Sequence, residues 1–183
     1  RHARMSEAGQ TTSEEALATN TVGPYEVSHK ENGCIVFIAA LSPTQLIVSS
    51  KNSIGGMDAP QHAEIGRQWL RRHLSHVHRT ELELCQLLHN QQITAVFELC
   101  DDDFEEHIVA YPPEKRGLYL HGVNRNTVNL DTWPSEQVRR LAVAFGFQIT
   151  QYRIFDTLDE VMSYCRTVRD GQTIGDNGEH LEG

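Results

Sequence analysis

The sequence lacks any hydrophobic stretch long enough to cross a membrane. Its longest apolar stretch runs from Cys34 to Leu41, whereas a membrane-spanning helix needs about 20 apolar residues. The segment from Arg1 to Asn20 is polar throughout and has no apolar core of the signal-peptide kind. We therefore expect no membrane partner. With 39% apolar and 22% charged residues, the composition is that of a folded globular domain.

The sequence also lacks paired cysteines. Its four cysteines contain no CxxC pair, and their spacing predicts neither a disulfide framework nor a zinc site. They are Cys34, Cys85, Cys100 and Cys165. This pattern predicts reduced and mostly buried thiols in an intracellular protein of the cytoplasm or the nucleus.

Positive charge is scarce, because the formal net charge is −9. That value argues against a protein that coats nucleic acids in general, but it allows local binding of a nucleic-acid end. One basic stretch stands out, with His73, His76 and His78 interleaved among Arg67, Arg71, Arg72 and Arg79. A solvated helix face is the favoured interpretation, and a phosphate-contacting ridge is the alternative. Because His78 falls off the face of His73 and His76, the three histidines do not predict a metal site.

The residue pattern predicts an α+β fold with a mainly antiparallel sheet and flanking helices. Strands are expected at residues 25–30, 34–40, 45–50, 93–99, 108–111, 117–123 and 148–155, and helices at 63–77, 80–88, 135–144 and 158–168. Thr80 and Glu83 form a capping-box pattern at the start of the second helix. Asn32-Gly33 predicts a tight hairpin turn between the first two strands.

Acidic residues follow the strand at 93–99, at Asp101 to Asp103 with Glu105 and Glu106. A calcium site is one interpretation. The spacing lacks the glycine and the final glutamate of an EF-hand loop, so a solvated turn is favoured.

Lys30 is expected at the mouth of the predicted hairpin, where a rigid strand end would hold it against a ligand. A lysine amine attacks only when it is neutral, and a nearby cation favours that form. Lys51 could supply such a cation, or could neutralise a triphosphate. Glu98 lies within an otherwise apolar strand, where a carboxylate is costly unless it is paired or near a ligand. It is interpreted either as a solvent-facing residue or as a contact to a hydroxyl or metal.

Lys30-Glu31-Asn32-Gly33 resembles the first motif of the covalent nucleotidyltransferases, which include RNA ligases, DNA ligases and mRNA capping enzymes. Four blocks together resemble a narrower family, the adenylyltransferase domain of fungal tRNA ligases. These blocks are KENGCIVFIAA (30–40), SSKNSIG (49–55), FELCDDDFEEH (97–107) and GLYLHGVNRN (117–126). The resemblance covers Thr21 to the C-terminus.

The resemblance implies a nucleotidyltransferase fold of the ligase and capping-enzyme type, with ATP and Mg²⁺ as cofactors and RNA (tRNA exon halves) as a partner. Lys30 would be catalytic: it would take up AMP, which would pass to an RNA 5′-phosphate before joining to a 3′-hydroxyl. Glu31, Asn32 and Gly33 would bind the nucleotide as members of the same motif.

The resemblance also assigns roles outside the first motif. Glu98 is expected at the ribose, Lys51 near the phosphates, and Gly117 to Val123 beside the adenine. His121 could donate to the nucleotide or could merely lie in a strand. Glu182 matches the glutamate of the fourth motif, which lies near the metal.

The domain prediction is a disordered lead-in from Arg1 to Asn20 and a partial adenylyltransferase domain from Thr21 to Gly183. The domain is expected to be C-terminally incomplete, because the fifth motif does not follow Glu182-Gly183. One alternative is therefore a truncated, inactive fragment that binds nucleotide weakly. Another keeps the superfamily but changes the substrate, to DNA ligation or RNA capping.

Overall fold

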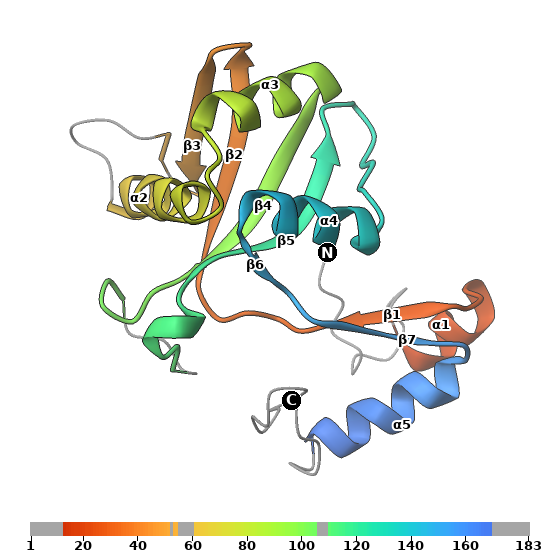
Figure 1. Ribbon diagram of the computed structural model, residues 1–183. Coiled ribbons are helices and arrows are strands. Elements are labelled where there is room, and N and C mark those ends of the chain that lie inside the picture. The colour runs from red at the N-terminus through yellow and green to blue at the C-terminus, as the bar shows by residue number, and fades with distance from the viewer. Residues whose placement is uncertain (1–12, 52, 55–60, 106–109, 170–183) are drawn as a thin grey trace. The chain divides into compact units, whose positions relative to one another are not determined.

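A computed structural model describes residues 13–51, 53–54, 61–105 and 110–169 (Figure 1). The chain forms two units. The larger one comprises Lys30–Thr150, and the smaller one combines Arg1–His29 with Gln151–Gly183.

The larger unit is built on a five-stranded sheet in the order β3-β2-β4-β5-β6. Its strands are β2 (Cys34–Ser42), β3 (Gln45–Ser50), β4 (Ile93–Cys100), β5 (Gly117–Arg125) and β6 (Gln148–Ile149). All neighbours are antiparallel except β5 and β6, which run parallel. The prediction of an α+β fold with a mainly antiparallel sheet is therefore confirmed.

Three α-helices pack against this sheet through one hydrophobic cluster. They are α2 (Gln61–His76), α3 (Glu81–Gln91) and α4 (Ser135–Phe145), and a short 3₁₀ helix, η1, spans Pro113–Lys115. The predicted capping box begins α3, where Thr80 and Glu83 each accept a hydrogen bond from the other's backbone N–H. None of the helices described has both the length and the apolar character that crossing a bilayer requires.

The two faces of the sheet differ because side chains alternate along a strand. On β4, the buried Phe97 and Leu99 point toward the helices. Glu98, between them, therefore points to the opposite face, where its neighbours in register are Ile35 of β2 and Tyr119 of β5. This second face carries the polar site described below.

The smaller unit contains a two-stranded antiparallel ribbon of β1 (Tyr25–Ser28) and β7 (Tyr152–Phe155). Two helices accompany it, α1 (Glu14–Asn20) and α5 (Leu158–Arg169), as Figure 1 shows. Residues 14–20 of the predicted lead-in form α1, which Ser13 caps by accepting from the Ala16 N–H at 3.2 Å. Residues 1–12 lie outside the described part of the chain.

The predicted hairpin at Asn32-Gly33 is wrong. The strand before it, β1, pairs with β7, whereas β2 pairs with β3 and β4. A different physical reason explains the glycine at position 33: a Cβ there would collide with the carbonyl oxygen of Leu99. Residue 33 is therefore small because the backbone passes close to β4, not because a tight turn needs a positive φ.

The structure differs from two further strand predictions. The single strand predicted at 148–155 is divided between β6 of the five-stranded sheet and β7 of the ribbon. Of the strand predicted at 108–111, residues 108 and 109 are not described, and Tyr111 lies outside any strand.

Candidate functional site

Lys30 to Gly33, which we call the lysine segment, have no regular secondary structure and lead into β2. The side chain of Lys30 is exposed, and it makes no hydrogen bond or ion pair with any other described residue. The next three residues, by contrast, are half-buried and held by side chains from distant parts of the chain. The lysine is thus accessible on an anchored backbone.

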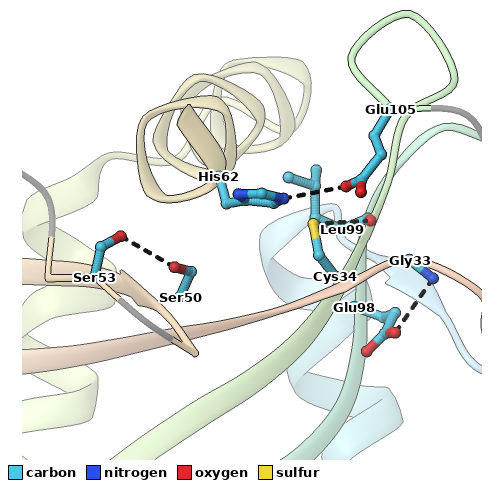
Figure 2. A network of polar contacts seen from close by, with 8 residues as sticks. All are labelled: Gly33, Cys34, Ser50, Ser53, His62, Glu98, Leu99 and Glu105. Carbon is cyan, nitrogen blue, oxygen red and sulfur yellow. Dashed lines mark hydrogen bonds and ion pairs between the residues drawn. The ribbon is translucent and has the colours of Figure 1, made fainter. Parts of the chain in front are cut away.

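Glu98 anchors this segment from β4. Its Oε1 accepts a hydrogen bond from the Gly33 N–H at 3.2 Å, a contact visible in Figure 2. Its side chain is 18% exposed, and its Oε2 lies 4.0 Å from Nε2 of His121. Glu98 is therefore not the solvent-facing strand residue of one prediction. The carboxylate thus links the lysine segment to the face of the sheet opposite the helices.

His121 owes its position to an irregularity in β5. Phe97 pairs with Leu120 and Val96 pairs with Gly122, so His121 is the extra residue of a β-bulge. A bulge re-aims a side chain and is common beside active sites. Here it leaves the exposed imidazole within ion-pair distance of Glu98.

Tyr111 anchors the segment from a second side and was not predicted as a site residue. Its hydroxyl accepts from the Asn32 N–H at 2.8 Å and donates to Oε2 of Glu31 at 3.0 Å. Burial raises the pKa of Tyr111 well above its usual value, so the hydroxyl stays protonated and keeps its donor. No residue pattern marks Tyr111, because it is 79 positions from Asn32 along the chain.

The ring of Tyr111 is itself held in place. Its backbone N–H donates to Oδ2 of Asp102 at 2.6 Å, and its ring packs edge-to-face on Tyr119 with centroids 5.8 Å apart. Tyr111 is only 7% exposed. The contact to Asn32 and Glu31 therefore comes from a fixed side chain.

Lys51 directly follows β3, at the end of the sheet where β2 begins, since Ser50 pairs with Val36. Its side chain is exposed. Beside it, the Ser50 N–H donates to the carbonyl of Ser53 at 2.8 Å, and the two hydroxyls lie 3.0 Å apart (Figure 2). The structure thus places Lys51 near this end of the sheet but shows no contact between it and Lys30 among the described residues. Glu182 lies outside the described residues.

All four cysteines are free thiols: Cys85 and Cys100 are buried, and Cys34 and Cys165 are half-buried. Burial, reinforced by the negative charges of Glu105 and Glu98, raises the pKa of Cys34 to about 12. Burial likewise raises the pKa of Cys100 to about 12. Both thiols are neutral near pH 7, and a neutral thiol is a poor nucleophile because the thiolate is the reactive form.

The basic stretch on α2 is only partly the solvated face that was favoured. Arg67 and Arg71 both bind Glu81, at 2.9 and 2.7 Å, and Arg79 binds Glu83 at 2.9 Å. His73 departs from the prediction because it is buried, with only 8% exposed. Two glutamates thus engage three of the four arginines, whereas the guanidinium of Arg72 lies over the Trp69 ring, 4.7 Å from its centroid.

His73 joins α2 to the sheet. Its Nδ1 lies 2.8 Å from the carbonyl oxygen of Gly146, and its Nε2 accepts from the Leu118 N–H at 3.0 Å. Accepting at Nε2 leaves the proton on Nδ1, which donates to Gly146. Burial lowers the pKa of His73 to about 4, so the ring is neutral in this position.

Comparisons with known proteins by family model and by sequence both find ligases. A family model described as RNA ligase matches residues 6–183. The chain is 44% identical over 175 residues to "tRNA ligase 1" of Schizosaccharomyces pombe and 37% identical over 190 residues to "tRNA ligase" of Candida albicans. Each alignment covers 94% of this chain but only 22% and 23% of those proteins. The chain thus spans less than a quarter of the curated relatives that it matches.

A solved structure shares the fold. The structure titled "Archaeal ATP-dependent RNA ligase - form 2" aligns with a TM-score of 0.57 and 15% sequence identity. The alignment covers 86% of this chain and 39% of the archaeal chain. The similarity in fold is consistent with the nucleotidyltransferase architecture that the motifs predicted.

Proposed function

Because this chain belongs to the RNA ligase family, we propose that it is the adenylyltransferase part of an ATP-dependent ligase that joins tRNA exon halves. The observation that carries the proposal is the anchoring of the segment after Lys30. Glu98 holds Gly33, and Tyr111 holds Asn32 and Glu31. Lys30 is left exposed at the start of this segment.

The proposed first step forms a phosphoramidate on Lys30. The neutral Nζ attacks the α-phosphorus of ATP, the bond from that phosphorus to the oxygen bridging to the β-phosphate breaks, and pyrophosphate leaves. The amine loses a proton as the P–N bond forms. AMP then passes to the 5′-phosphate of RNA, and a 3′-hydroxyl displaces it to close the new phosphodiester.

The remaining candidate residues are proposed to position the nucleotide. Glu98 uses one oxygen for Gly33, and its other oxygen faces His121 on the open side of the sheet. A carboxylate and an imidazole together suit the donors and acceptors of ribose hydroxyls. Lys51 carries a point charge suited to the β- and γ-phosphates.

Mg²⁺ would supply charge neutralisation at the phosphates. The carboxylates of Glu31, within the lysine segment, and of Glu98, which binds it, are hard oxygen donors of the type that Mg²⁺ prefers, and they are the described residues that would hold such an ion. Glu182 stays a predicted ligand from the fourth motif.

The experiment is intact-mass analysis after incubation with ATP and Mg²⁺, followed by peptide mapping. The chain has only three lysines, Lys30, Lys51 and Lys115, so an AMP adduct can be assigned without ambiguity. We expect one adduct, on Lys30, that is absent from Lys30→Ala. It should also be absent from Lys30→Arg, because a guanidinium keeps the charge but is not a nucleophile.

Lys115→Ala is the matched control and should keep the adduct. An adduct on Lys51 or Lys115 would show that the nucleophile is wrongly assigned. A second candidate is a chain that binds nucleotide without reacting. Binding of ATP with no adduct on any lysine would select that candidate.

A further inference from the structure

Three metal-ligating side chains meet beside the start of β2, outside the proposed adenylylation site. Sγ of Cys34, a ring nitrogen of His62 and a carboxylate oxygen of Glu105 all lie within 4.8 Å of one another. Nε2 of His62 is 3.1 Å from Oε2 of Glu105. Figure 2 shows His62 and Glu105 pointing toward each other, with the sulfur of Cys34 close to the imidazole.

The segments that carry these residues are fastened to one another. His62 lies in the first turn of α2, and Glu105 lies in the turn after β4. Asp101 connects the two: its Oδ2 accepts from Nε1 of Trp69 on α2 at 2.7 Å, and its carbonyl accepts from the Glu105 N–H at 3.0 Å. Asp101 is buried, so this connection is shielded from water.

The side chains of His62 and Cys34 are also restrained. The ring of His62 packs edge-to-face on Phe104, with centroids 5.0 Å apart. Cys34 pairs with Leu99 in the sheet, and its Sγ lies 3.8 Å from the carbonyl oxygen of Leu99. The three donors therefore converge from a framework that is already in place, which reduces the ordering that metal binding would require.

From this geometry we propose that Cys34, His62 and Glu105 form a binding site for a transition-metal ion of the Zn²⁺ type. A thiolate, an imidazole and a carboxylate are all ligands of Zn²⁺, and three protein ligands leave a fourth position open. Mg²⁺ and Ca²⁺ are disfavoured because they select oxygen ligands.

The distances are compatible with such a site. Metal–ligand bonds of about 2.0–2.3 Å in a tetrahedron place ligand atoms roughly 3–4 Å apart. His62 and Glu105 already meet that spacing, and small side-chain rotations would bring Cys34 to it. A coordinating thiol loses its proton, so the bound ion would replace it.

The proposal is independent of the adenylylation chemistry. It does bear on the same region, because Cys34 directly follows Gly33, which Glu98 holds. An ion on Cys34 would add a further restraint at the start of β2.

The test is titration of the full chain with Co²⁺, a spectroscopic substitute for Zn²⁺, followed by competition with Zn²⁺. We expect one ion per chain and an absorption band from thiolate-to-cobalt charge transfer, which Zn²⁺ abolishes. Cys34→Ser should lose this band, whereas Cys165→Ser, which changes another half-buried thiol, should keep it.

Glu105→Gln gives a second variant, because this exposed side chain can change without disturbing the core. It should weaken Co²⁺ binding by more than about 100-fold, the upper end of the effect of losing a group that merely supports a ligand. Absence of the charge-transfer band from the unaltered chain, or its survival in Cys34→Ser, would overturn the proposal. Equal Co²⁺ affinity of Glu105→Gln and the unaltered chain would remove Glu105 from the site.

Discussion

At the scale of single residues, burial gives two side chains of the same chemical type different surroundings. His73 is closed off in the larger unit and bonded at both ring nitrogens, whereas His121 stands exposed on a bulge. Protonation of the His73 ring at Nε2 would break its hydrogen bond from the Leu118 N–H. Residue type alone therefore does not determine which histidine is chemically available.

His73 should make the stability of the protein depend on pH. Its pKa is about 4 in the folded chain and about 6.5 when unfolded. Between these values the unfolded chain binds one more proton, so stability falls as the pH drops from about 6.5 to about 4. The contribution is complete above pH 6.5, and its loss amounts to about 3 kcal/mol.

The matched variant is His73→Gln, which can still donate and accept but does not titrate. Urea unfolding of both proteins from pH 7 to pH 4 isolates the histidine from the carboxylates, which titrate in both. The stability difference between the two proteins should shrink as the pH falls. A difference that stays constant would show that His73 is not kept neutral by the fold.

At the scale of elements, the lysine segment depends on a close approach between two parts of the backbone. A Cβ at Gly33 would collide with the Leu99 carbonyl and would lie 2.9 Å from Sγ of Cys100. The backbone of β4 leaves no room to yield, because Leu99 and Cys100 are fully buried and paired with β5. The segment, rather than the strand, would have to move.

Gly33→Ala should therefore displace Lys30 while leaving the sheet folded. We expect AMP-adduct formation to slow by about 100-fold, the effect that a misplacement of about 1 Å can have. Rates from intact-mass time courses measure this effect, with circular dichroism as the check on folding.

The unaltered chain, measured under the same conditions, is the reference for this prediction. Equal rates for Gly33→Ala and the unaltered chain would mean that the close approach at Gly33 does not position the lysine.

At the scale of the whole molecule, the charge balance limits how the chain can hold RNA. The net charge is −9, and two of the α2 arginines that could have formed a phosphate ridge, Arg67 and Arg71, are engaged with Glu81. Glu81 keeps its charge: burial opposes ionisation, but its bonds to Arg71 and Arg67 prevail and lower its pKa. These two arginines are then less able to bind RNA phosphates and release their counterions.

Binding of a 5′-phosphorylated RNA by this chain should therefore depend weakly on salt. If about three phosphates or fewer are contacted, log K against log salt should have a slope no steeper than about −2. Fluorescence anisotropy at several salt concentrations measures the slope.

Glu81→Gln releases the charges of Arg67 and Arg71 and should make the slope steeper. A steep slope already in the unaltered chain would contradict the prediction. It would indicate a basic surface beyond the paired arginines.

Much of the fold followed from local patterns. Alternating and continuous apolar residues located β2, β3, β4 and β5, and the Thr80–Glu83 pair located the start of α3. Four ordered motif blocks predicted the family to which the chain belongs. These features are encoded in short segments, because strand and helix periodicity and capping depend on neighbours in sequence.

Strand pairing and the convergence of side chains were decided only by the tertiary structure. Asn32-Gly33 suggested a hairpin by its local preference, but β1 pairs with β7, more than 100 positions along the chain. Tyr111 reaches Glu31 across 80 positions, and Cys34 meets His62 and Glu105, although cysteine spacing predicted no metal site. The sequence by itself predicted most elements of the larger unit, and it gave the hypothesis that the lysine segment is reactive. The packing of those elements decided its anchors, because contacts between distant residues leave no periodic trace in the chain.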